Sequence, residues 1–218
     1  MNLSVNAIIP AGGTSSRFGN KNKLLEKING KEVIKYTVEA FEKSNVNKII
    51  ICANISIIED LKNIFRDFNK VTIIEGGATR QESVFNGLKS EDCDYVLIHD
   101  AARPMISTDL INIAIEEVIT KKALTVATKT IDTIKEVENG KIVRTINRSK
   151  LYNTQTPQAF QYDLIKDAHI KLYGQNFTDD AGMLEELGQT VYILNGSYKN
   201  IKITTQNDID IANVYLSE

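Results

Sequence analysis

A glycine-rich loop near the start of the chain has the residue types of a phosphate-binding site. The apolar run Ala7–Ile9, typical of a buried strand, passes directly into Pro10–Gly13, and Arg17 and Lys23 follow. Glycine lets backbone N–H groups approach an anion closely, and a following helix would add the positive end of its dipole. The loop lacks both the Gly-Lys-Ser/Thr ending of a Walker A motif and the spacing of a dinucleotide fingerprint. It is therefore either an uncommon phosphate loop or a plain tight turn.

A second glycine turn repeats this arrangement. The apolar run Val71–Ile74 leads into Gly76-Gly77-Ala78, and Thr79 is suited to cap the helix that follows. Close approach of the backbone at the glycine pair suits a flat ligand such as a nucleobase. Ser83, one turn into the helix, could donate a hydrogen bond to a base edge or simply face solvent.

A third loop carries opposite charges at the end of an apolar strand. The run Tyr95–His99 is followed by Asp100 and then by Arg103, and Pro104 blocks further strand pairing. Two interpretations stay open for this loop. It is either a rigid charged binding loop or an internal ion pair that binds no ligand.

Short β-rich runs alternate with segments of helical apolar spacing along most of the chain. Strands are predicted at Ala7–Ile9, Lys48–Ala53, Val71–Ile74, Tyr95–His99, Leu124–Thr128, Val191–Leu194 and Ile201–Ile203, and helices around residues 33–41, 57–68 and 110–118. This alternation predicts an α/β fold with a doubly wound, mostly parallel sheet. Ligands bind at the carboxyl ends of such strands, so the loops after Ile9, Ile74 and His99 should meet there.

Residues 129–150 break the pattern. Ile131–Val137 and Lys141–Ile146 are strand-like runs joined by Glu138-Asn139-Gly140, and Asn-Gly is a strong hairpin signal. An isolated two-stranded ribbon is only marginally stable in water. The segment is therefore either a solvent-exposed excursion or an arm that pairs with another subunit.

Composition favours a single globular domain spanning residues 1–218. The 218 residues are 42% hydrophobic and carry a net charge of −2, so no basic excess points to nucleic acid or to a membrane surface. The sequence shows neither a signal peptide nor a membrane-span pattern, and a cytoplasmic location is expected. Of the two histidines, His99 is predicted to be structural at a strand end and His169 to lie on a helix surface.

Several segments together carry a family resemblance. They are PAGGTSSRFGNKNK, GGATRQESV, VLIHDAARP, IDTIK, NRSKLYNTQTPQAF, TDDAGMLEELG and GSYKNIKITTQND. In this order and spacing, over nearly the whole chain, they resemble the 2-C-methyl-D-erythritol 4-phosphate cytidylyltransferases. The resemblance implies a Rossmann-like sheet of the nucleotide-diphospho-sugar transferase type with an inserted β-hairpin dimerisation arm. It also implies a homodimeric enzyme of non-mevalonate isoprenoid biosynthesis that joins CTP to a polyol phosphate, 2-C-methyl-D-erythritol 4-phosphate, and releases pyrophosphate.

The resemblance assigns roles motif by motif. It implies that the triphosphate lies against Pro10, Ala11, Gly12, Gly13, Arg17 and Lys23. Cytosine and ribose would lie against Gly77, Ala78, Ser83 and Ala101, although Ala78 stands where the family often has an acidic residue. The polyol phosphate would contact Asp100, Arg103, Thr156 and Lys202, with Thr133 and Arg148 reaching across from the arm of the second subunit. The cofactor would be Mg²⁺ or another divalent cation, held mainly by the CTP phosphates, with Asp100 as a candidate ligand.

The chemistry implied in this way needs few protein groups. A phosphate monoester is already largely dianionic near pH 7, so its attack on the α-phosphorus of CTP requires neither a protein nucleophile nor a general base. Catalysis would depend on the positive charges of Arg17, Lys23, Arg148 and Lys202. Two alternatives remain: a related ribitol 5-phosphate cytidylyltransferase, and a non-catalytic nucleotide-binding regulatory module.

Overall fold

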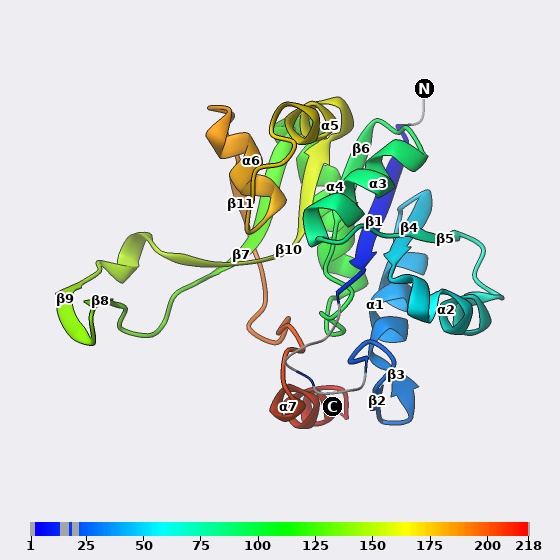
Figure 1. The fold of residues 1–218 in the computed structure, drawn as a ribbon, viewed down its shortest axis with the longest axis horizontal. Coiled ribbons are helices and arrows are strands. Elements are labelled where there is room, and N and C mark those ends of the chain that lie inside the picture. The colour runs from blue at the N-terminus through cyan, green and yellow to red at the C-terminus, as the bar shows by residue number, and fades with distance from the viewer. Residues whose placement is uncertain (1–2, 14–17, 19–21, 218) are drawn as a thin grey trace.

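The computed structural model describes residues 3–13, 18 and 22–217, and a central sheet organises them (Figure 1). Within this part of the chain, seven strands form the sheet in the order β11-β7-β10-β6-β1-β4-β5. Their bounds are Val5–Ala11 (β1), Lys48–Ala53 (β4), Val71–Glu75 (β5), Tyr95–Ile98 (β6), Ala123–Lys129 (β7), Tyr152–Gln161 (β10) and Tyr192–Asn195 (β11). All pairs in this sheet except those of β10 are parallel, which confirms the predicted mostly parallel, doubly wound fold.

Parallel pairing aligns the ends of the central strands. β1 pairs in parallel with both β4 and β6, with Ile8 opposite Ile50 on one side and Ile98 on the other. The strands are apolar on both faces because both faces are covered by helices. The carboxyl ends of β1, β5 and β6 consequently open at the same edge, which is where the three predicted loops begin.

One strand of the sheet, β10, was not predicted from the sequence. β10 lies between β6 and β7 and runs antiparallel to both. Its first half is polar, and it contains Pro157, which has no N–H to donate to a strand ladder. The strand accommodates this proline at an irregularity between Thr154 and Gln158, where the register shifts and the pairing is interrupted.

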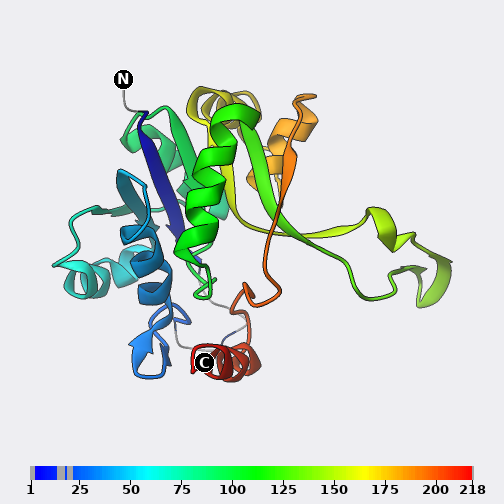
Figure 2. The ribbon, with the colours of Figure 1, turned by 180° about the vertical axis from the view of Figure 1, so that it is seen from behind.

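Helices cover the sheet from two sides (Figure 2). One apolar cluster packs α1 (Val33–Glu42), α2 (Ile58–Phe65) and α4 (Thr108–Lys121) against the sheet, and the other packs α3 (Arg80–Ser90), α5 (Tyr162–Lys171) and α6 (Asp180–Glu186). The first cluster extends to α7 (Gln206–Tyr215), which contacts β2 (Lys27–Ile28) and lies below the sheet in Figure 1. Ile9 belongs to the first cluster and Ile8 to the second, as strand alternation requires. The three predicted helical segments are confirmed as α1, α2 and α4. No helix in the described part of the chain has the length and apolar character that a bilayer span requires.

The predicted strand Ile201–Ile203 is wrong. These residues form no strand ladder, although their backbone is anchored by single contacts, including Ile203 N–H to the Ala102 carbonyl at 2.8 Å. The apolar side chains of segment 201–203 therefore pack against loops, and the segment is not part of the sheet.

Short elements connect the larger ones in the described part of the chain: β2 (Lys27–Ile28), β3 (Lys31–Glu32), η2 (Ile55–Ile57) and η3 (Arg148–Lys150).

The predicted hairpin is confirmed and projects from the body of the molecule in both views (Figures 1 and 2). β8 (Lys135–Glu138) pairs antiparallel with β9 (Lys141–Thr145), and its first strand is shorter than predicted. Asn139 and Gly140 both have positive φ, 48° and 77°, as a two-residue hairpin turn demands. We call residues 129–150 the arm.

Candidate active site

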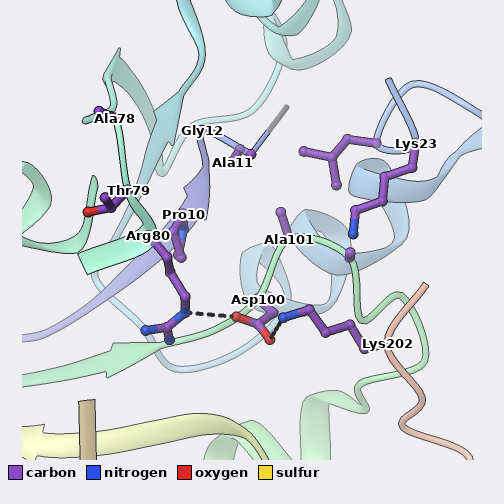
Figure 3. Close-up of a pocket in the computed structure, with 13 residues that line it drawn as sticks. Pro10, Ala11, Gly12, Lys23, Ala78, Thr79, Arg80, Asp100, Ala101 and Lys202 are labelled. Atoms are coloured by element: carbon purple, nitrogen blue, oxygen red, sulfur yellow. Dashed lines mark hydrogen bonds and ion pairs between the residues drawn. The ribbon is translucent and has the colours of Figure 1, made fainter. Parts of the chain in front are cut away.

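The three predicted loops meet around one cavity of about 270 Å³ (Figure 3). Its lining combines the glycine loop, the start of α3, the loop after β6 and two lysines: Pro10, Ala11, Gly12, Gly13, Lys23, Leu24, Ala78, Thr79, Arg80, Asp100, Ala101, Ala102 and Lys202. Most of the lining side chains are small, and Lys23, Arg80, Asp100 and Lys202 are its charged members. A cavity of this composition suits a phosphorylated ligand with a flat group at one end.

Asp100 is the centre of the charged side of this cavity. Its Oδ1 accepts from Arg80 Nε at 3.2 Å, while Oδ2 lies 2.9 Å from Lys202 Nζ and 3.6 Å from Arg103 Nε. Figure 3 shows Arg80 and Lys202 converging on the carboxylate. Burial raises the pKa of Asp100, but the charges of Arg80 and Lys202 more than offset it, so that the pKa lies well below its usual range. The aspartate is therefore ionised, and its charge is matched within the chain.

A second cavity of about 230 Å³ adjoins the first. It is lined by Arg80, Asp100, Arg103, Thr154, Gln155, Thr156, Gln158, Thr178, Asp179 and Lys202. Arg80, Asp100 and Lys202 line both cavities. The two spaces therefore share one charged wall, which could hold two anions close to each other.

Thr156 and His99 fix the geometry of the loop after β6. The Thr156 hydroxyl accepts the Asp100 N–H at 3.1 Å and lies 3.0 Å from His99 Nδ1, and His99 Nε2 lies 3.3 Å from the Arg103 carbonyl. Since a carbonyl can only accept, Nε2 carries the proton and Nδ1 accepts from Thr156. Burial lowers the pKa of His99 to about 4, which keeps the ring neutral. His99 is thus structural, as predicted.

Segment 200–204 places Lys202 and secures Lys23. Asn200 is 1% exposed and donates to the Thr156 carbonyl at 2.9 Å, while Arg103 Nη1 donates to the Asn200 carbonyl at 2.8 Å. Lys23 Nζ donates to the Ile203 carbonyl at 2.9 Å. The segment therefore joins the glycine loop, the charged loop and the middle of β10 at the cavity edge.

The second glycine turn is tied to α3 by its own N–H groups. Thr79 caps the helix as predicted, Glu82 completes a capping box with it, and Glu82 also accepts the Ala78 N–H at 2.7 Å. Ser83 is fully buried; its hydroxyl accepts the Gly77 N–H at 3.0 Å and donates to the Thr79 carbonyl at 2.9 Å. A Cβ on Gly77 would lie 2.2 Å from Glu82 Cβ, so only glycine fits there. Ser83 supports this turn and does not face solvent.

Comparison with known proteins decides the family. The family model of 2-C-methyl-D-erythritol 4-phosphate cytidylyltransferases matches residues 5–218. The chain belongs to this family. A relative of that name from Clostridioides difficile is 41% identical over 219 residues, covering 96% of this chain and 92% of the relative. The resemblance inferred from the motifs is thereby confirmed, and the chain is a cytidylyltransferase of isoprenoid precursor biosynthesis.

Solved structures of the family share the fold. A 4-diphosphocytidyl-2C-methyl-D-erythritol synthase from Anaerococcus prevotii superposes with a TM-score of 0.89 at 32% identity, covering 99% of this chain and 97% of that one. The 2-C-methyl-D-erythritol 4-phosphate cytidylyltransferase from Thermus thermophilus gives 0.84 at 27% identity and full coverage of both chains. The likeness extends over the whole chain, arm included.

The site residues that the family resemblance assigned fall into three groups. Most surround the two cavities: Pro10, Ala11, Gly12, Gly13, Lys23, Ala78, Asp100, Ala101, Arg103, Thr156 and Lys202 line them, and Gly77 and Ser83 lie just behind. Arg17 lies outside the described residues. Thr133 and Arg148 lie on the arm, exposed, and the Arg148 guanidinium donates to the Ile131 carbonyl. The body of one chain therefore does not bring these two residues to its own cavities.

Two residues differ from what the sequence indicated. His169 was predicted on a helix surface but is 1% exposed, and its Nε2 lies 3.2 Å from Asp180 Oδ1. The prediction failed because α5 packs on α6, so that the face of α5 carrying His169 is covered. Arg80, which lines both cavities, was not singled out at all. Its place at the start of α3, directly after the glycine turn, was the available signal.

Proposed function

We propose that this chain joins CTP and 2-C-methyl-D-erythritol 4-phosphate to give 4-diphosphocytidyl-2-C-methyl-D-erythritol and pyrophosphate. The observation that carries the proposal is the pair of adjoining cavities with a shared charged wall of Arg80, Asp100 and Lys202. The first cavity, with its small residues and Lys23, suits the nucleotide. The second, lined by hydroxyl, amide and charged side chains, suits a phosphorylated polyol.

The reaction follows from bringing two anions together. An oxygen of the polyol monophosphate attacks the α-phosphorus of CTP, a new P–O bond forms, and the bond to the β-phosphate oxygen breaks to release pyrophosphate. Lys23, with Arg17 of the same loop, neutralises charge on the triphosphate and on the leaving group. Lys202 lies on the shared wall, where it reduces repulsion between the two phosphates.

The second glycine turn would receive the base. The N–H groups of Gly77, Ala78 and Thr79 are used within the turn, and the Thr79 carbonyl accepts from the Ser83 N–H and hydroxyl, so we assign the Ala78 carbonyl as the acceptor for a ligand. The exocyclic amino group of cytosine is a hydrogen-bond donor, and carbonyls accept from it. Ala78 accordingly contributes backbone in place of the acidic side chain common in the family.

Mg²⁺ is proposed to arrive with the nucleotide. The described residues contain no group of three His, Cys, Asp or Glu side chains arranged to hold a metal ion. Asp100, the candidate ligand, already has Arg80, Arg103 and Lys202 beside its carboxylate oxygens, which disfavours a further cation. A protein-built Mg²⁺ site therefore does not fit these side chains, and the ion is assigned to the CTP phosphates.

A homodimer is proposed to complete the polyol-phosphate site. The arm exposes apolar side chains that a lone ribbon cannot bury: Ile131 at 63%, Val137 at 53% and Ile142 at 65% exposure. It also carries Thr133 and Arg148, which the family motifs assign to the polyol phosphate. In a two-fold dimer the arm of each chain could pack on its partner and deliver both residues there.

Substrate choice tests this function. With CTP and Mg²⁺, 2-C-methyl-D-erythritol 4-phosphate should give a higher kcat/KM than ribitol 5-phosphate, since the buried Ala101 and Ala102 leave room beside Asp100 for a branched tetrol. Initial rates of pyrophosphate release would measure both. A higher kcat/KM with ribitol 5-phosphate would contradict the proposed substrate and indicate a ribitol 5-phosphate cytidylyltransferase. CTP binding without single-turnover product from either polyol would indicate a regulatory module.

A further inference from the structure

Arg80 stands at the junction of the two cavities and lines both. It comes from the first turn of α3, and its side chain is 28% exposed. The guanidinium is held on one edge by two carboxylates. Nε donates to Asp100 Oδ1 at 3.2 Å, and Nη2 lies 2.8 Å from Asp180 Oδ2. No role for Arg80 follows from the family motifs considered above.

Asp180 is built to hold this guanidinium. The residue is 1% exposed at the start of α6, its Oδ1 lies 3.2 Å from His169 Nε2, and its N–H donates to the Gln158 side chain at 2.9 Å. A buried carboxylate is costly unless it is paired, and Arg80 supplies the full opposite charge. Burial raises the pKa of Asp180, but Arg80 and His169 outweigh it and the pKa is lowered. The pair is therefore a fixed ionic contact.

The two carboxylate contacts leave N–H groups of Arg80 available to a ligand. A guanidinium has five N–H groups. Asp100 accepts the Nε hydrogen, whereas Asp180 Oδ2 faces Nη2 as an ion pair and accepts no hydrogen bond. Among the described residues, Nη1 has neither a hydrogen-bond nor an ion-pair partner. The hydrogens of Nη1 and Nη2 at the end of the guanidinium form a fork whose geometry matches two oxygens of a phosphate.

We propose that Arg80 is a further substrate-contacting residue, which binds a phosphate oxygen where the two cavities meet, and that Asp180 is the positioning residue that orients it. The proposal rests on the proposed function, because it takes the two ligands to be CTP and a polyol phosphate. Asp100 alone would leave Arg80 free to turn about one contact. The second carboxylate fixes the plane of the guanidinium before substrate arrives, which removes an entropic cost of binding.

Steady-state kinetics with CTP and 2-C-methyl-D-erythritol 4-phosphate test the proposal. R80A should lower kcat/KM on the order of 10- to 100-fold, the scale for losing a charged hydrogen bond, and millimolar guanidinium ion should restore part of the activity. R80K keeps the charge without the fork and should remain at least several-fold impaired. R66A, on exposed Arg66 of the α2 end, is the matched control and should behave as wild type.

A double-mutant cycle tests the positioning role. D180N keeps the shape of Asp180, removes its charge, and should lower kcat/KM roughly tenfold. If Asp180 acts through Arg80, the R80A/D180N double variant should be no slower than R80A alone. Additive losses, or an R80A variant with wild-type kinetics, would overturn the proposal. Failure of D180N to fold would leave R80K and guanidinium rescue to decide. A wild-type enzyme inactive on these substrates would instead refute the proposed function.

Discussion

The body of the molecule and the arm both depart from the usual distribution, in which charged side chains are exposed and apolar ones are buried. In the body, Asp100 and Asp180 are buried and each is paired with a cation of the same chain. On the arm, Ile131 and Ile142 are more than half exposed. Buried charges are tolerated because their partners are present, whereas exposed apolar groups indicate a partner that one chain does not supply. The body therefore assembles its part of the site within one chain, and the proposed dimer would give the apolar side chains of the arm a second copy to pack against.

The largest expected effect comes from removing a charge in the body. K23A should lower kcat on the order of 10²-fold or more, because Lys23 lines the first cavity and its charge would act on the triphosphate. Stopped assays of product formation at saturating substrates would measure it. K62A, on exposed Lys62 of α2, is a charge-matched control and should leave kcat unchanged. Turnover of K23A near the wild-type rate would remove Lys23 from the mechanism.

Mixing two variant chains tests whether the body of one chain and the arm of the other form one site. K23A impairs the body and R148A impairs the arm, so each homodimer should be nearly inactive. A mixed dimer would hold one intact site, with Lys23 from one chain and Arg148 from the other. With random mixing about half the dimers are mixed and each has one working site, so activity should approach roughly a quarter of wild type by two-fold symmetry.

The opposite outcome of this mixing experiment is equally defined. If each arm served its own body, every mixed dimer would contain two impaired sites and the mixture would stay as inactive as its parents. Subunit exchange must be verified, for example by native mass spectrometry of chains that differ in mass. Co-refolded K62A and wild-type chains provide the control for losses during exchange.

Sequence patterns predicted the parts of the fold that depend on local spacing. The buried positions of α1, Val33, Ile34, Thr37, Val38 and Phe41, match the predicted helical stripe, and the Asn139-Gly140 turn follows from its residue types. β10 was missed because its polar first half and Pro157 do not resemble a central strand, and only pairing with β6 and β7 makes it one. Ile201–Ile203 was wrongly predicted as a strand because its apolar residues suit a buried strand, whereas the segment pairs with no strand.

The candidate site was predictable where a motif places a residue on a loop at a strand end. Asp100 and Arg103 were found in this way and Lys202 through the family resemblance, and the three side chains lie together in the structure. Arg80 was missed because its importance arises from tertiary contacts with Asp100 and Asp180, which are 20 and 100 positions away in the chain. Charge pairing over such separations leaves no local signature.

The last predicted effect is on stability and not on turnover, and it concerns the body alone, because His99 is part of the body's site loop and no histidine lies on the arm. Burial lowers the pKa of His99 from 6.5 to about 4, so between these values the unfolded chain holds a proton that the folded chain lacks. Falling pH therefore favours unfolding in this window, and the His99 contribution, present in full above pH 6.5, is lost by pH 4. The loss amounts to about 3 kcal/mol at 1.36 kcal/mol per pKa unit.

Urea unfolding from pH 7 to 4 should show a steeper decline in stability for wild type than for H99Q, whose amide can still donate to the Arg103 carbonyl but does not titrate. Equal slopes for the two proteins would mean that His99 takes up its proton at the same pH in the folded and the unfolded chain, and the pKa lowered by burial would be wrong.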